Sequence, residues 1–158
     1  MPRMPNTQPS LQREPLIPTV AQYPMQFVAA DLFTWLGKHY LTMVDRFSGF
    51  PWVCQLRSLS TSAIIEKLQN WFCDFGYPTI IRTDGGPQFR NEFKRYCSMH
   101  NIFQETSSAY YPESNGLAEN AVKTCKHLLK KCNAHWPTFK DALLHWRNMP
   151  RPDGISPA

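Results

Sequence analysis

Three of the twelve acidic residues lie in surroundings that suggest chemistry. Asp31 lies within the apolar run FVAADLF, where an unpaired charge costs several kcal/mol unless it pairs or binds a cation. Asp84 follows the β-branched run PTIIRT and precedes two glycines, a position where α/β sheets usually open their sites. Glu119 lies early in a helical segment that follows a glycine-containing loop. Together the three predict a cage for Mg²⁺ or Mn²⁺, because hard cations prefer oxygen ligands.

Such a cage predicts phosphoryl transfer. Two ions about 3.5–4 Å apart activate a nucleophile and stabilise the leaving oxygen of an in-line displacement. Carboxylates at strand ends are also common structural residues, so the pattern alone leaves a structural role open. Asp45 is interpreted as structural, since it ends a predicted strand and the adjacent Arg46 offers a local ion pair.

A row of lysines continues the helical face of Glu119. Lys123, Lys126 and Lys130 follow it by four, seven and eleven residues, which places them on one stripe of an α-helix. This stripe lies where a DNA backbone would pass the metal site. Ordinary amphipathicity explains the row equally well, and both interpretations can hold for one helix.

The formal charge of +5 is concentrated in the last quarter of the 158-residue chain. Residues 1–119 hold ten basic and ten acidic side chains, whereas residues 120–158 hold seven and two. A local basic stretch favours a polyanionic partner, nucleic acid before a membrane surface. A solvated helix face is the alternative, and it is the interpretation kept for Lys131, Lys140 and Arg147.

Several other classes of protein do not fit. No run approaches the roughly 18 apolar residues of a membrane span, and the sequence does not begin with a signal-peptide core. Five widely spaced cysteines favour reduced thiols in an intracellular protein that is not secreted. The cluster of Cys125, His127, Cys132 and His135 does not favour zinc, because on a helix His127 points away from both cysteines.

A mixed sheet with helices on its faces would have to position these residues. The expected elements are strands at 26–33, 38–45 and 50–56, a helix at 60–75, a strand at 78–83, a helix at 89–100, a strand at 102–106, and helices from 114 or 115 to 134 and from 138 to 147. The short spacers between the first three strands predict an antiparallel meander. Leu143, Leu144 and Trp146 are the packing candidates of the last helix, and Thr138 is its expected cap.

This order predicts an α/β fold, a five-stranded mixed sheet flanked by helices. We expect one core domain at 25–150, after a proline-rich leader or linker at 1–24 and before a C-terminal tail at 151–158.

Four segments, in order, resemble the catalytic core of retroviral and long-terminal-repeat retrotransposon integrases, most closely the Ty3/Gypsy type. They are VAADLF at 28–33, YLTMVDRFSGFPWV at 40–53, RTDGGPQFRNEF at 82–93 and SSAYYPESNGLAENAVK at 107–123. The resemblance runs from about Glu14 to Ala158. It implies an RNase H-like fold and a D, D, E metal triad, which Asp31, Asp84 and Glu119 match. The 34 residues between the last two acids are one fewer than the family's commonest spacing.

The resemblance also implies contacts with DNA. Tyr110 and Asn115 lie in a loop that touches the DNA end in the family, although Tyr110 could equally be a packing aromatic. Lys123 and Lys126 match family positions that contact DNA. Gln88 belongs to a DxGxQF motif near the metals and is a candidate for hydrogen bonding there.

The function implied by this resemblance is that of an integrase, a polynucleotidyl transferase and endonuclease. Water attacks a phosphodiester near each end of the element's DNA, which is 3′-end processing. The freed 3′-hydroxyl then attacks target DNA in strand transfer. The cofactor would be two Mg²⁺ or Mn²⁺ ions and the partner DNA. The chain would act in the nucleus as a homodimer or higher multimer, not at a membrane.

Two alternatives stand beside this function. One is a catalytically silent, integrase-derived domain that binds DNA or protein. The family's upstream His₂Cys₂ zinc module and downstream DNA-binding module are not recognisable, so the chain resembles an isolated core. The other alternative is a ribonuclease H-type hydrolase, against which the YxPxSNG loop followed by AENAVK argues.

Overall fold

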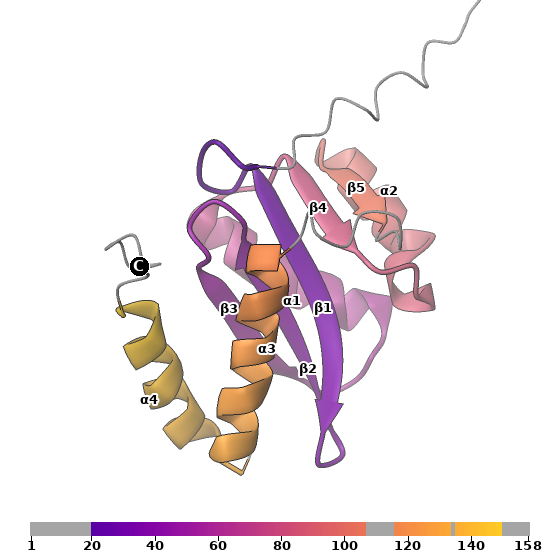
Figure 1. Cartoon of the computed structure of the whole chain (residues 1–158). Helices are drawn as coiled ribbons and strands as arrows, with labels where there is room; N and C mark the ends of the chain where they lie inside the picture. The colour runs from indigo at the N-terminus through magenta and orange to yellow at the C-terminus, as the bar shows by residue number, and fades with distance from the viewer. Residues whose placement is uncertain (1–19, 107–115, 134, 150–158) are drawn as a thin grey trace, which may run out of the picture.

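The computed structural model describes residues 20–106, 116–133 and 135–149, except for the side chains of residues 116–119. Within these ranges a single five-stranded sheet lies between two layers of helices (Figure 1). Most of the leader or linker predicted at 1–24, and all of the tail at 151–158, lie outside the described residues. No helix in the described ranges is long and apolar enough to cross a membrane.

The first three strands form the antiparallel meander that the sequence predicts. They are β1 (Phe27–Trp35), β2 (Lys38–Asp45) and β3 (Pro51–Leu56). Leu36 and Gly37, with φ of 51° and 73°, form the turn between β1 and β2. Two-residue hairpin turns of this kind require positive φ, which glycine adopts without strain. The β1–β2 ladder continues to the Trp35–Lys38 pair, so β1 ends two residues later than predicted.

Two further strands lie parallel to β1. They are β4 (Ile80–Thr83), which pairs with β1, and β5 (Phe103–Thr106), which pairs with β4. The strand order is therefore β3-β2-β1-β4-β5, which confirms the predicted five-stranded mixed sheet. β1 is the central strand, so its carboxylate Asp31 lies in the middle of the sheet.

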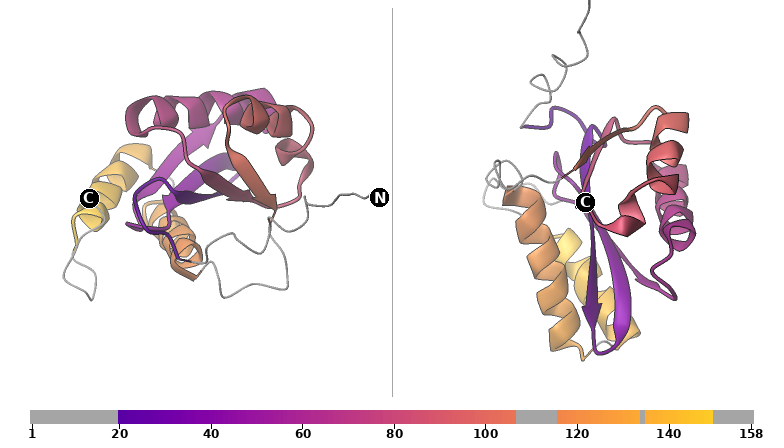
Figure 2. Two further views of the ribbon diagram at one scale, coloured as in Figure 1. Left: turned by 90° about the horizontal axis from the view of Figure 1, so that it is seen from above. Right: turned by 90° about the vertical axis from the view of Figure 1, so that its right-hand side faces the viewer.

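Helices cover both faces of the sheet. α1 (Thr61–Phe75) and α2 (Glu92–Met99) lie on one face, and α3 (Gly116–Lys131) and α4 (Trp136–Arg147) lie on the other (Figure 2). A short 3₁₀ turn, η3 (Pro87–Phe89), connects β4 to α2.

Two cores result, because successive side chains of a strand point to opposite faces. Val28 and Ala30 of β1 pack with α1 and α2, whereas Ala29 packs against Ala121 of α3. The second core is built around one aromatic side chain of β2 and consists of Tyr40, Cys125, Leu129, Phe139 and Leu143. β1 therefore contributes side chains to the packing on both faces of the sheet.

The ends of the helices lie within three residues of those predicted: α2 begins three residues later than predicted, and α3 ends three residues earlier. At the start of α1 the Ser60 side chain accepts a hydrogen bond from the Ala63 N–H at 3.2 Å, as expected of an N-cap. α4 begins earlier than predicted, with His135 as its N-cap and Pro137 in the first turn. Proline is favoured there because a first-turn N–H has no helical partner to lose. The Thr138 hydroxyl instead forms a hydrogen bond with His135 Nδ1 at 2.7 Å.

Candidate active site

The register of the sheet brings Asp31 and Asp84 together. β1 and β4 pair in parallel up to Ala29 and Arg82, and the same register continued by two residues aligns Asp31 with Asp84. Residues two apart share a face of a strand, so Asp31 lies on the face of Ala29, which α3 covers. Burial raises the pKa of Asp31, and the charge of Asp84 raises it further. The two carboxylates are therefore electrostatic neighbours.

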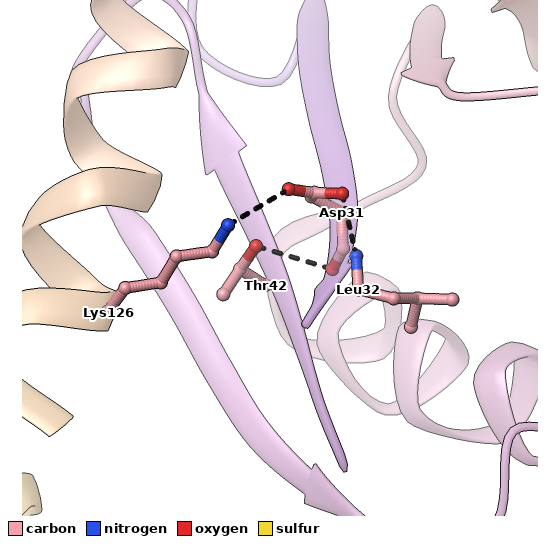
Figure 3. Close-up of polar contacts among 4 residues, drawn as sticks. All are labelled: Asp31, Leu32, Thr42 and Lys126. Carbon is pink, nitrogen blue, oxygen red and sulfur yellow. Dashed lines mark hydrogen bonds and ion pairs between the residues drawn. The ribbon is translucent and has the colours of Figure 1, made fainter. Parts of the chain in front are cut away.

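Asp31 also has partners that favour its ionised form. The Leu32 N–H donates a hydrogen bond to Asp31 Oδ1 at 2.9 Å, and Lys126 Nζ lies 3.9 Å from Oδ2 (Figure 3). Both interactions lower the pKa of the Asp31 carboxyl, but burial outweighs them. The side chains of Asp31 and Lys126 are each 39% exposed, so the carboxylate is partly desolvated and still accessible.

Asp84 lies just beyond β4, at the start of the Asp-Gly-Gly turn. Its Oδ1 accepts a hydrogen bond from the Gly86 N–H at 2.8 Å. A Cβ on Gly86 would lie 3.0 Å from this oxygen and 3.1 Å from Gln88 Oε1. Glycine at position 86 therefore leaves room for both side chains, and Gln88 lies beside Asp84. The Gln88 carbonyl accepts a hydrogen bond from the Thr61 hydroxyl at 2.9 Å, which holds this turn against α1.

α3 carries the lysine stripe along β1. Lys126 Nζ lies 5.4 Å from the centre of the Phe33 ring, and Lys130 Nζ lies 5.0 Å from the Trp35 ring. Glu119 is in the first turn of α3, two turns before Lys126 on the same stripe. Its side chain lies outside the described residues. The stripe thus follows the strand that bears Asp31.

Of the other residues predicted to contact DNA, only Lys123 is among the described residues. Lys123 is exposed on α3, one turn before Lys126. Tyr110 and Asn115 lie outside the described residues.

The sequence alone does not reveal the pairing of Lys126 with Asp31. Its one sequence signal is the seven-residue interval between Glu119 and Lys126, which puts the lysine on a carboxylate-bearing stripe. The face of β1 that this stripe meets depends on how α3 packs on the sheet.

Asp45 has the structural role predicted for it, through hydrogen bonds that the sequence did not reveal. It is 2% exposed, and its carboxylate accepts hydrogen bonds from the N–H groups of Met25, Phe47 and Ser48 and from the Ser48 hydroxyl. The Arg46 guanidinium, predicted to pair with it, lies over the Phe27 ring at 4.2 Å. Asp45 thus closes the turn between β2 and β3.

The donor set suits a hard divalent cation. Among the described side chains, no group of three or more His, Cys, Asp or Glu residues could hold a metal ion. Asp31 and Asp84 nevertheless supply oxygen donors whose mutual repulsion a cation would relieve, and an ammonium group already lies beside Asp31. Cys125 is buried and His127 exposed, so the two do not converge on a zinc site.

Sequence comparisons identify a family model and relatives that match this chain. A family model described as "Integrase core domain" matches residues 23–112. An uncharacterized protein of Caenorhabditis elegans is 33% identical over 129 residues, which are 77% of this chain and 10% of that protein. The Pol polyprotein of Radiation murine leukemia virus (strain Kaplan) is 31% identical over 131 residues, 76% of this chain and 22% of the polyprotein. The chain thus spans less than a quarter of the length of these relatives.

Solved structures share the fold. The catalytic core domain of BIV integrase has a TM-score of 0.73 and 17% identity, over 84% of this chain and 91% of that one. The HTLV-2 integrase catalytic core domain in complex with magnesium has a TM-score of 0.67 and 24% identity, over 85% and 94%. These likenesses confirm the RNase H-like fold expected from the resemblance.

Proposed function

Because the chain belongs to the integrase core domain family, we propose that it catalyses divalent-metal-dependent polynucleotidyl transfer on DNA. One observation carries this proposal above the others. Asp84 follows the strand that pairs with β1 and is close enough to Asp31 to raise its pKa, and α3 brings Lys126 Nζ to 3.9 Å from Asp31 Oδ2. Two coupled carboxylates beside a basic helix are suited to hold cations and a phosphodiester together.

Each residue has a proposed role. Asp31, Asp84 and Glu119 hold two Mg²⁺ or Mn²⁺ ions. These ions, when bound, activate the attacking oxygen and stabilise the leaving oxygen of an in-line displacement. Gln88, beside Asp84, orients that carboxylate or the substrate by hydrogen bonding.

The remaining roles concern the nucleic acid. Lys123 and Lys126 contact phosphates of the DNA end, and Tyr110 and Asn115 contact the same end from the preceding loop. The reactions are 3′-end processing and strand transfer into target DNA. We place them in the nucleus, where chromosomal DNA lies.

A multimer is part of the proposal. The HTLV-2 core structures are described as trimeric and dimeric forms, and another structural neighbour belongs to an intasome. We therefore propose that the working unit contains at least two copies of this chain.

The test is metal-dependent joining of a recessed DNA end by the purified chain. Asp84→Asn should reduce joining to background in Mg²⁺ and in Mn²⁺, because the variant loses one charged metal ligand while keeping the size of the side chain. Circular dichroism should show the fold unchanged. Asp74→Asn, an exposed carboxylate of α1, is the matched control and should join normally.

Other outcomes of this test contradict the proposal. Joining by Asp84→Asn at the wild-type rate would sink the assignment of the site. Salt-sensitive DNA binding without any joining would identify a silent DNA-binding domain. Cleavage of an RNA–DNA hybrid without joining of DNA would identify a ribonuclease H-type hydrolase.

A further inference from the structure

Lys126 is held beside a carboxylate that, under the proposed function, holds metal. Its ammonium lies 3.9 Å from Asp31 Oδ2 (Figure 3) and 5.4 Å from the centre of the Phe33 ring. Lys130, one turn later on α3, lies over an aromatic ring in the same way, Trp35 at 5.0 Å. Each lysine therefore lies over an aromatic ring of its own, but Lys126 also contacts Asp31.

We propose that Lys126 is the resident counter-ion of Asp31 in the metal-free protein, and that a divalent cation displaces it on binding. The displaced ammonium then becomes available to a DNA phosphate. The inference rests on the proposed function, since it takes a metal at Asp31 and DNA along α3 as given. It adds that the two binding events are coupled through one side chain.

Electrostatics requires an exchange. A divalent cation about 2.1 Å from Asp31 Oδ2 would lie at most about 6 Å from Lys126 Nζ as placed, given the 3.9 Å separation. Two positive charges at that distance repel each other, and both compete for one carboxylate. Lysine can move away because its charge sits on a flexible four-carbon stem.

The geometry of the pair makes the exchange easy. The 3.9 Å separation is longer than a hydrogen bond, and both side chains are 39% exposed. Such pairs contribute little to stability, so leaving Asp31 costs Lys126 little. The Phe33 ring is close enough to keep the ammonium near the site after it moves.

Release changes what α3 offers to DNA. While Lys126 neutralises Asp31, the exposed Lys123 is the neighbouring charge available on this stripe. After metal binding both lysines face the same path, so metal and phosphate each favour binding of the other. A site without metal then binds DNA about two- to five-fold less tightly than a site with metal.

The first test measures Mn²⁺ affinity by electron paramagnetic resonance in the whole chain without DNA. Lys126→Gln should bind Mn²⁺ about two- to five-fold more tightly than wild type, because the competing charge is gone. Lys130→Gln is the matched control on the same helix and should leave the affinity unchanged. Asp84→Asn should weaken binding, and thermal unfolding verifies that each variant is folded.

Each alternative result has one meaning. Wild-type Mn²⁺ affinity in Lys126→Gln, with weakened binding in Asp84→Asn, overturns the counter-ion role and leaves the proposed function standing. Equal tightening by both lysine variants points to the general field of the helix and also overturns it. Mn²⁺ binding that does not depend on Asp84 removes the metal site itself, and both proposals with it.

The second test uses the reciprocal effect. With a duplex oligonucleotide, Lys126→Gln should lose about two- to five-fold more DNA affinity in Mn²⁺ than in EDTA, because only metal releases the wild-type ammonium. An equal loss under both conditions overturns the release step.

Discussion

At the scale of single residues, Asp31 is subject to opposing influences. Burial and the neighbouring Asp84 raise its pKa, whereas Lys126 and the Leu32 N–H lower it, and the net effect is a rise above the ordinary value of 3.8. The folded, metal-free protein therefore disfavours the charged form of a carboxylate that its proposed function requires. A bound cation would supply the missing compensation.

This balance predicts how stability depends on pH. The unfolded chain releases the Asp31 proton at a lower pH than the folded protein, so the contribution of Asp31 to stability falls as pH rises above 3.8. In EDTA, Asp31→Asn should therefore gain stability relative to wild type as the pH rises above 3.8. Urea unfolding at several pH values measures the difference.

The control and the contrary result are equally specific. Asp74→Asn, on the exposed surface of α1, should show no comparable trend. If wild type gained stability relative to Asp31→Asn as pH rises, the charged form would be the favoured one and this account of the site would be wrong.

At the scale of elements, α4 is fixed to the sheet through its last residue. Arg147 donates hydrogen bonds from Nε, at 3.0 Å, and from Nη2 to the Pro51 carbonyl at the start of β3. Its guanidinium also lies 4.4 Å from the centre of the Phe50 ring. The sequence suggested a solvated charge here, but the side chain is half-buried, and burial lowers its pKa. Arg147 is thus an anchor of the helical layer that includes α3.

Removing this anchor should loosen α4. Arg147→Met keeps much of the side-chain volume but loses both hydrogen bonds, which should cost about 1–3 kcal/mol of unfolding free energy. Amide hydrogen exchange in α4 should become faster. Lys140→Met, exposed on the same helix, is the control and should change neither quantity appreciably. Unaltered protection of α4 in Arg147→Met would show that the core contacts of Phe139 and Leu143 hold the helix without it.

At the scale of the whole molecule, the fold protects some thiols and leaves others accessible. All five cysteines are free, as the sequence predicts. Cys73 is exposed, whereas Cys97 and Cys125 are buried on opposite faces of the sheet. Burial raises the pKa of Cys97 to about 11 and that of Cys125 to about 12. Neither buried thiol ionises at neutral pH while the fold is intact.

Thiol titration with a disulfide reagent at neutral pH should therefore be biphasic. Cys73 should react fast, because its sulfur is exposed and accessible to the reagent. Cys97 and Cys125 should react only as fast as the protein unfolds. Cys73→Ser should reduce the amplitude of the fast phase by one thiol, since Cys54 and Cys132 are partly accessible. Reaction of Cys97 or Cys125 in the fast phase would show that one of the cores opens in the native protein.

The sequence by itself determined the elements and the two strand-borne acids. Apolar periodicity and turn residues are local signals set by backbone sterics, and they gave strands and helices within a few residues of those observed. Asp31 was recognisable because a charge in an apolar strand needs a partner, and Asp84 because it ends a strand. That Asp84 lies near Asp31 depends on the parallel pairing of β4 with β1.

Only the tertiary structure decided how the elements meet. Leu144 illustrates this: the sequence offered it for packing, but α4 docks through Phe139 and Leu143 and leaves Leu144 59% exposed. Lys126 illustrates it at the site. The sequence predicts that this lysine contacts DNA, and the fold also places it beside Asp31, which lies 95 positions earlier in the sequence. Helix docking and strand order minimise the free energy of the whole chain, so no local pattern contains them.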